Sequence, residues 1–316
     1  MKKGLKITLT IILVLVLVIF VGFTYFVGKG VFDGMTNVIS REDTVKNISF
    51  YEDEYRDLEK EYKVEKFKVN SENNDHEIPA IIVSSHGKEN ENIAILLHGI
   101  GGTKESMSHV AKLFIDMGYD CLIFDQRNSG ENMADYNTFG VLESDDCLDM
   151  INYAIEHMDY RGKLLLYGES LGGATATIAA SKDDSNIDYI ILDCPVSDSY
   201  VFADEIFNKI EKEQGLPKSY MKFAGNIFLK SKLGFTMNEI NSADYIRGKE
   251  LSEAVLIINS KADKVTPYEM GKEIYDAIKG DKKELHTEEN YGHIKFAQEN
   301  PKKFKEVIKN FLKKFQ

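Results

Sequence analysis

Short apolar runs alternate with amphipathic segments along most of the chain. Runs with the character of buried strands lie at residues 93–97, 119–124, 164–167, 189–192 and 255–258. Helical patterns at residues 104–117 and 142–158 separate some of them. Two earlier stretches, residues 64–69 and 78–83, are expected to be antiparallel strands that open the sheet. The alternation predicts an α/β fold with a mainly parallel sheet and helices on both faces.

The first thirty residues have a different pattern. Residues 7–27 form an almost unbroken apolar stretch, long enough to cross a bilayer as one helix. Lys2, Lys3 and Lys6 precede it, which predicts a cytoplasmic N-terminus and an extracytoplasmic remainder. We therefore expect a single-pass protein of the cell membrane. A cleavable signal peptide is the alternative, although the run is long for one and residues 28–31 lack a small-residue cleavage site.

The patterns divide the chain into three parts. Residues 1–28 are expected to form the cytoplasmic tip and transmembrane anchor, and residues 29–62 a charged, partly helical stalk. Residues 63–316 have the length of one α/β domain. Within it, residues 197–250 are too long for an ordinary connection and carry apolar residues at helical spacing, which predicts a helical cap. Most of these apolar faces should pack on the main domain, and a minority could line an acyl pocket.

Composition narrows the possible partners. The formal net charge of −12 argues against nucleic acid. The three cysteines, Cys121, Cys147 and Cys194, are an odd number without C-x-x-C spacing, so neither a disulfide framework nor a zinc site is expected. We expect small buried residues at these positions, and no metal or cofactor.

The strongest candidate for chemistry is Ser170. It lies in Gly-Glu-Ser-Leu-Gly-Gly at residues 168–173, between the strand run 164–167 and a segment of helical composition. A G-x-S-x-G match is weak alone, but its strand-to-helix setting is typical of a nucleophile on a strained turn. The glycines would be needed where strand and helix crowd together.

An acid and a base follow in chain order. Asp263 comes after the strand run 255–258, in an Asp-x-Val-x-Pro loop, and His293 follows a short strand-like stretch. An imidazole must take the serine proton, and a carboxylate must orient that imidazole. Asp193, after another strand, is the rival acid. His98 ends a strand beside a glycine-rich loop. The remaining histidines have loop, helix or strand patterns typical of surface or packing residues: His76, His86, His109, His157 and His286.

The order Ser170, Asp263, His293 resembles that of the α/β-hydrolase superfamily, and the resemblance extends over about residues 64–315. It implies the α/β-hydrolase fold, with a helical cap. In this superfamily the residue after His-Gly in the loop His-Gly-Ile-Gly-Gly, and the residue after the nucleophile, supply backbone N–H groups to the oxyanion. By resemblance these residues are Ile100 and Leu171. The D-x-R-x-x-G segment at residues 125–130 would organise a nearby loop.

The resemblance implies a serine hydrolase that cleaves carboxylic esters through an acyl-enzyme at Ser170, and the apolar N-terminal stretch predicts that it is anchored in the membrane. Its substrate would be a small-molecule ester, a lipid or a peptide. The same residues serve peptidases of the proline-type aminopeptidase kind and acyltransferases. A binding protein that keeps the fold without catalysis is a further alternative, and the sequence leaves all of these open.

Overall fold

The structure is a computed structural model that describes residues 2–72, 76–87, 90–158 and 160–316. The chain forms two compact units. The larger unit consists of Ile39–Ser199 and Ile240–Gln316, and the smaller unit of Met1–Val38 and Tyr200–Glu239. The sheet belongs to the larger unit. The smaller unit combines the N-terminal helix with most of the segment expected to form a cap.

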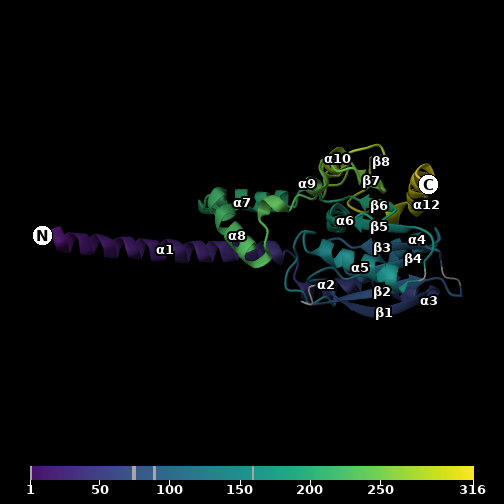
Figure 1. The fold of residues 1–316 in the computed structure, drawn as a ribbon, viewed down its shortest axis with the longest axis horizontal. Helices are drawn as coiled ribbons and strands as arrows, with labels where there is room; N and C mark the ends of the chain where they lie inside the picture. The colour runs from purple at the N-terminus through teal and green to yellow at the C-terminus, as the bar shows by residue number, and fades with distance from the viewer. Residues whose placement is uncertain (1, 73–75, 88–89, 159) are drawn as a thin grey trace. The chain divides into compact units, whose positions relative to one another are not determined.

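The larger unit is built on one eight-stranded sheet in the order β1-β2-β4-β3-β5-β6-β7-β8 (Figure 1). In chain order the strands are β1 (Lys63–Asn70), β2 (Glu77–Ser84), β3 (Asn92–Leu97), β4 (Tyr119–Phe124), β5 (Leu164–Glu169), β6 (Tyr189–Asp193), β7 (Ala254–Ser260) and β8 (Lys283–Glu288). β2 is antiparallel to both β1 and β4, and the remaining pairs are parallel. The predicted mainly parallel sheet with antiparallel opening strands is confirmed.

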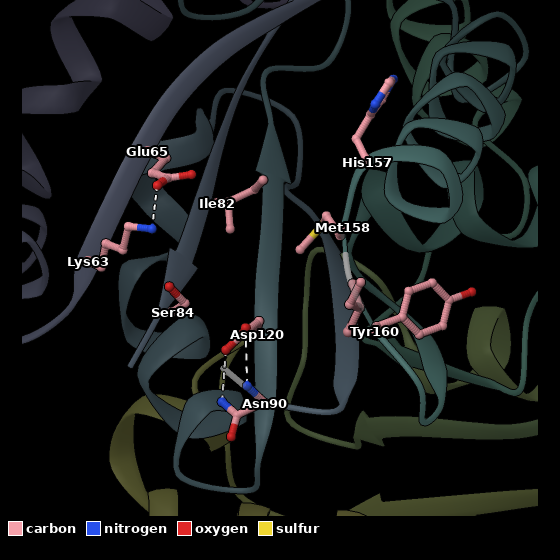
Figure 2. A pocket seen from close by; sticks show the side chains of 10 residues that line it. Lys63, Glu65, Ile82, Ser84, Asn90, Asp120, His157, Met158 and Tyr160 are labelled. Atoms are coloured by element: carbon pink, nitrogen blue, oxygen red, sulfur yellow. Dashed lines mark hydrogen bonds and ion pairs between the residues drawn. The ribbon is translucent and has the colours of Figure 1, made fainter. Parts of the chain in front are cut away.

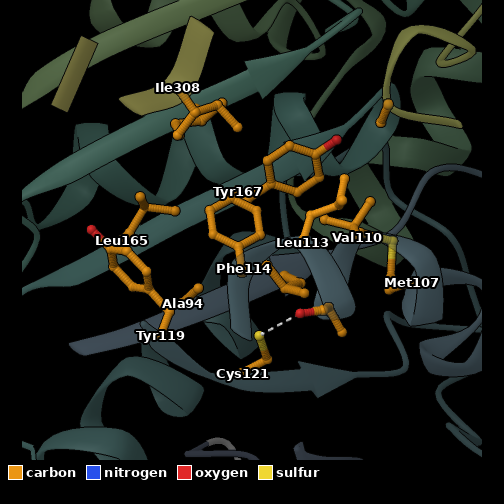
Figure 3. Close-up of a cluster of buried hydrophobic side chains, with 14 of the residues drawn as sticks. Ala94, Met107, Val110, Leu113, Phe114, Tyr119, Cys121, Leu165, Tyr167 and Ile308 are labelled. Atoms are coloured by element: carbon orange, nitrogen blue, oxygen red, sulfur yellow. Dashed lines mark hydrogen bonds between the residues drawn. The ribbon is translucent and has the colours of Figure 1, made fainter. Parts of the chain in front are cut away.

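Helices cover both faces of the sheet. One face packs against α3 (Glu52–Glu61), α4 (Ser108–Ile115), α11 (Phe296–Glu299) and α12 (Pro301–Lys314). The other packs against α5 (Glu143–His157), α6 (Leu171–Lys182), α9 (Ser242–Ile246) and α10 (Tyr268–Ala277). Successive strand residues point to opposite faces, so Ile95 and Leu96 enter different cores. Figure 3 shows part of the first core, where the rings of Phe114 and Tyr167 meet edge to face at 5.3 Å.

Short helices precede the sheet and follow β3. α2 (Arg41–Asn47) begins after Ser40, whose hydroxyl accepts a hydrogen bond from the Asp43 N–H, and η1 (Ile48–Phe50) leads into α3. η2 (Lys104–Met107) precedes α4. The helical character expected of residues 29–62 is therefore present. All three cysteines are buried free thiols, as expected.

The smaller unit consists of α1 (Lys2–Thr36), α7 (Tyr200–Gln214), α8 (Lys218–Leu233) and η3 (Met237–Glu239). α8 packs against α1: the Tyr220 ring stacks on Phe23 at 5.7 Å, and its hydroxyl lies 2.7 Å from Thr24 Oγ1. A Cβ at Gly28 would lie 2.7 Å from the Phe228 ring, so this glycine allows the two helices to approach closely. The apolar faces of the insertion thus contact the N-terminal helix, a packing partner that the sequence analysis did not predict.

Candidate active site

Ser170 lies on a sharp turn between β5 and α6. Its φ of 52° and ψ of −115° are strained for a residue with a side chain. Small neighbours make the turn possible, because a Cβ at Gly168 would lie 2.3 Å from the Gly172 carbonyl oxygen and one at Gly172 would lie 2.3 Å from that of Leu97. The predicted reason for the flanking glycines is confirmed. The turn presents Ser170 at the carboxyl ends of the parallel strands, where ligands bind in open α/β sheets.

Asp263 and His293 meet at the same edge, in the loops after β7 and β8. His293 Nδ1 lies 2.8 Å from Asp263 Oδ2. The other carboxylate oxygen accepts hydrogen bonds from the N–H groups of Val265 at 2.8 Å and Thr266 at 3.0 Å. Burial raises the pKa of Asp263, but the hydrogen bond and charge of His293, with these N–H groups, outweigh it and hold the pKa below its usual value. Asp263 is therefore an anion placed to orient the imidazole.

A backbone hydrogen bond connects Ser170 to the end of β6, and the Cys194 thiol that follows β6 lies near Asp263 and His293. The Ser170 N–H donates to the Asp193 carbonyl at 2.9 Å. The next residue, Cys194, places its sulfur within 4.8 Å of ligand atoms of Asp263 and His293. The structure thus brings the three predicted residues to one edge, while a Ser170–His293 hydrogen bond stays a prediction. Such bonds often tighten only when substrate is bound.

The rival acid Asp193 has a different partner. Its carboxylate is fully buried and accepts a hydrogen bond from the Tyr167 hydroxyl at 2.9 Å. Burial raises the pKa of Asp193 to about 6. Glu169, also buried, lies 3.4 Å from the same hydroxyl, and burial together with the Asp193 charge raises its pKa to about 8. These carboxyls form a buried group beneath the turn, and the hydrogen-bond geometry favours Asp263 as the partner of His293.

The glycine-rich loop after β3 lies against the serine. A Cβ at Gly99 would lie 3.1 Å from the Ser170 Cβ, so a side chain here would crowd the serine. In the described part of the chain, no backbone acceptor is bonded to the N–H of Ile100 or of Leu171. Both candidate oxyanion donors flank the serine, one through this loop and one through the chain itself. Their role stays a prediction.

His98 holds this loop in place. Its Nε2 accepts from the Gln126 N–H at 3.0 Å, and its Nδ1 lies 2.8 Å from the Gly99 carbonyl oxygen. The Gln126 side chain donates to the His98 carbonyl and accepts from the Thr175 hydroxyl at 2.7 Å. Burial lowers the pKa of His98, which agrees with a neutral ring that donates through Nδ1 and accepts through Nε2. His98 is therefore a positioning residue rather than a base.

The D-x-R-x-x-G segment organises the neighbouring loop, as expected. The buried Asp125 carboxylate accepts hydrogen bonds from Lys104 Nζ at 2.7 Å and from the N–H groups of Lys104 at 2.8 Å and Glu131 at 2.9 Å. A Cβ at Gly130 would lie 2.5 Å from this carboxylate. Because every acceptor oxygen is used structurally, Asp125 is unsuited to proton transfer.

A contribution that the sequence analysis missed comes from the segment around α2. The Asn47 side-chain amide donates to the Gly101 carbonyl at 3.0 Å, and a Cβ at Gly101 would lie 2.6 Å from Ile39 Cδ1. Thr44 Oγ1 accepts from the Gly130 N–H at 2.9 Å, and Arg41 donates to the Gly130 carbonyl at 3.1 Å. Residues expected to belong to a stalk therefore bond to the glycine-rich loop that contacts Ser170 and to the loop that contains Gly130. Their polar side chains carried no signal of this contact.

A pocket of about 210 Å³ lies elsewhere in the larger unit (Figure 2). Its lining includes Ser84 at the end of antiparallel β2 and Ile93 and Asp120 near the starts of β3 and β4. It therefore lies at the amino ends of the parallel strands, opposite the edge that carries Ser170. Asp120 is paired there with the Asn90 side chain at 2.8 Å. We assign this pocket no part in the chemistry.

Cys194, Asp263 and His293 are the one group of potential metal ligands found among the described residues. Burial raises the pKa of the Cys194 thiol well above its usual value. A neutral thiol is a poor metal ligand, because metals bind the thiolate. Asp263 and His293 are instead hydrogen-bonded to each other at 2.8 Å.

Comparisons with known proteins agree with the fold. A model of the α/β hydrolase fold family matches residues 94–239, which include Ser170 and the glycine-rich loop. The protein YqkD of Bacillus subtilis is 26% identical over 238 residues, covering 75% of each chain.

Solved structures also match the fold. The esterase Pf2001 of Pyrococcus furiosus matches with a TM-score of 0.63 and 20% identity, covering 82% of this chain and 95% of that one. Est1E of Butyrivibrio proteoclasticus, solved with ferulic acid bound, matches with a TM-score of 0.57 and 18% identity, covering 79% and 98%. Together with the strand order and the strained serine turn, these matches show that the chain has the α/β-hydrolase fold and that its central part is similar to the α/β-hydrolase family.

Proposed function

We propose that this protein is a membrane-anchored serine hydrolase that cleaves carboxylic esters through an acyl-enzyme on Ser170. The observation that carries the proposal is the convergence at one sheet edge. The strained Ser170 turn, the loop that contacts it and the hydrogen-bonded Asp263–His293 pair all lie at the carboxyl ends of the strands. This combination supports nucleophilic catalysis better than it supports binding alone.

Each group has one task in the proposed reaction. Ser170 Oγ attacks the ester carbonyl carbon while His293 Nε2 takes the hydroxyl proton, and Asp263 stabilises the imidazolium through Nδ1. The N–H groups of Ile100 and Leu171 donate to the oxyanion of the tetrahedral intermediate. The imidazolium then protonates the leaving alcohol, which leaves an acyl group on Ser170. Water activated by His293 releases the acid and restores the serine.

Ester substrates are favoured by the two structural neighbours described as an esterase and as a complex with ferulic acid. Peptide cleavage and acyl transfer would use the same groups. A panel of aryl esters and aminoacyl amides separates these possibilities, with Ser170→Ala as the control for each substrate. We expect hydrolysis of esters that Ser170→Ala abolishes. Turnover of amides alone would overturn the ester proposal, and turnover of neither would favour the non-catalytic alternative.

The membrane part of the proposal rests on α1. An 18-residue window of this helix has a mean hydropathy of 3.0, and its side chains are not buried in the structure. This composition and exposure support an anchor, formed by residues 1–28, with the catalytic domain on the extracytoplasmic side. The full-length protein should stay in the membrane after a carbonate wash. Protease added to intact cells without their outer wall should digest the catalytic domain.

Two outcomes would contradict that topology. Protection of the domain until the cells are lysed would place it in the cytoplasm. Recovery of a shortened soluble form from the medium would support a cleaved signal peptide instead.

A further inference from the structure

An apolar groove of about 490 Å³ lies in the smaller unit, lined by the second half of α1, by α7 and by Met221 at the start of α8. Figure 1 shows the course of these helices. The floor of the groove includes the buried side chains of Phe207 and Met221. Its α1 wall includes Tyr25 and Phe26, which are 59% and 74% exposed, although both are large and apolar. A volume of this size lies in the range of ordinary ligand sites.

The charges around the groove do not suit a polar ligand. The charged residues among those lining it are Lys29 and Asp33, and these two form an ion pair with each other one helical turn apart. Apolar side chains make up most of the remaining lining, and they cannot pair with a charged group placed deep inside. The groove therefore favours a hydrocarbon occupant.

The groove is continuous with a surface that already faces hydrocarbon in the proposed topology. Its wall residues Tyr25 and Phe26 directly follow the exposed apolar side chains of the membrane-length part of α1, such as Val21 and Phe23. α8 also exposes Phe223 and Ile227, which are 53% and 46% exposed, and α7 exposes Ile206 at the groove itself. An occupant can therefore enter from the bilayer without crossing water.

We propose that this groove binds one acyl chain of a lipid taken from the surrounding bilayer. The proposal rests on the membrane anchoring described above and goes beyond the ester chemistry, because it assigns a ligand to the smaller unit itself. An acyl chain matches the apolar lining of the groove. Its polar headgroup would remain at the membrane surface, near the Lys29–Asp33 pair.

Glycines of α1 offer matched variants. Gly30 and Gly34 line the groove, and a Cβ at either position meets nothing within 4 Å, so Gly30→Leu and Gly34→Leu would fill the space without a backbone clash. Gly22 on the same helix also has open space around it but does not line the groove, so Gly22→Leu is the control. Leucine is a better helix former than glycine, which keeps helix loss from explaining an effect. Gly28 is unsuitable because a Cβ there would lie 2.6 Å from the Ala224 carbonyl oxygen.

The probe is a phosphatidylcholine with a photoreactive diazirine on its acyl chain, mixed into vesicles of phosphatidylethanolamine and phosphatidylglycerol. The full-length protein is reconstituted, floated with the vesicles and irradiated. Mass spectrometry then compares cross-links on peptides of α7 and α8 with those on the first half of α1. The ratio of the two corrects for the amount of protein inserted.

We expect the wild type and Gly22→Leu to give cross-links on both sets of peptides. In Gly30→Leu and Gly34→Leu the ratio should fall about tenfold, as expected when a large side chain is forced into an occupied site. An equal ratio in all four proteins would overturn the groove as a binding site while leaving the anchor intact. Failure of the protein to float with the vesicles would overturn the anchor and, with it, the bilayer as the source of the ligand.

Discussion

The contact between α2 and the glycine-rich loop leads to a quantitative prediction. Asn47→Ala removes the side-chain amide that donates to the Gly101 carbonyl at 3.0 Å, next to the proposed oxyanion donor Ile100. A neutral hydrogen bond of this kind contributes about 1 kcal/mol. If that energy holds the loop in its transition-state position, its loss lowers kcat about fivefold. KM should change little, because the oxyanion forms only after the substrate is bound.

The assay is steady-state hydrolysis of a short aryl ester, with active sites counted by fluorophosphonate titration. Counting sites separates a slower enzyme from a smaller folded fraction. Asn186→Ala is the control, since Asn186 is exposed and bonds only to the neighbouring Ser185 among its described contacts. It should leave kcat unchanged.

The reasoning is refuted if Asn47→Ala lowers the unfolding temperature but leaves kcat per titrated site at the wild-type value. That result would make the α2 contact a contribution to stability alone. A rise in KM with constant kcat would also refute it, because it would show a role in binding the ground state.

Three further predictions test other parts of the structure. Asp263→Asn should lower kcat about ten-thousandfold. Asp193→Asn only replaces a charged acceptor of the Tyr167 hydroxyl by a neutral one, so it should lower kcat by at most about fivefold; the reverse ranking in ester kinetics would transfer the acid role to Asp193. Glu169 has its pKa raised by burial from 4.5 to about 8, so the unfolded chain releases its proton first and stability should fall as pH rises between these values. The unfolding temperature of Glu169→Gln should fall less than that of the wild type over this pH range. If the unfolding temperatures of the two proteins change in parallel with pH, the pKa of Glu169 is not raised in the folded state. A chain beginning at Ile39 keeps the α2 contacts and should hydrolyse short esters. It should aggregate without detergent, because α8 loses its α1 partner. A monodisperse chain in light scattering without detergent would contradict this expectation.

The parts of the site that the sequence predicted are those with a local signature. Ser170 was identified because a glycine-flanked serine followed an apolar strand run, and the structure shows that backbone atoms crowd both Gly168 and Gly172. Asp263 and His293 were found because strand runs mark where loops begin at one sheet edge. Parallel strands place successive loops together, so their pairing at 2.8 Å follows from chain order.

The missed parts depend on contacts between distant segments. Asn47 and Thr44 lie in a charged stretch that resembles a solvated linker, yet their partners Gly101 and Gly130 are 54 and 86 residues away. No periodicity encodes such a contact, because each is a single side chain bonded to a backbone group. The packing of Tyr220 on α1 was missed for a related reason: an apolar helical face shows that it will be covered but does not show by what.

The most direct test of the central claim is to locate the residue that a fluorophosphonate modifies. The full-length protein in detergent is labelled, digested and analysed by peptide mass spectrometry, alongside Ser170→Ala. The proposed mechanism predicts one adduct, on the peptide that contains Ser170, with no adduct and no ester hydrolysis in Ser170→Ala. An adduct on another serine, or wild-type hydrolysis by Ser170→Ala, would contradict the assignment of Ser170 as the nucleophile.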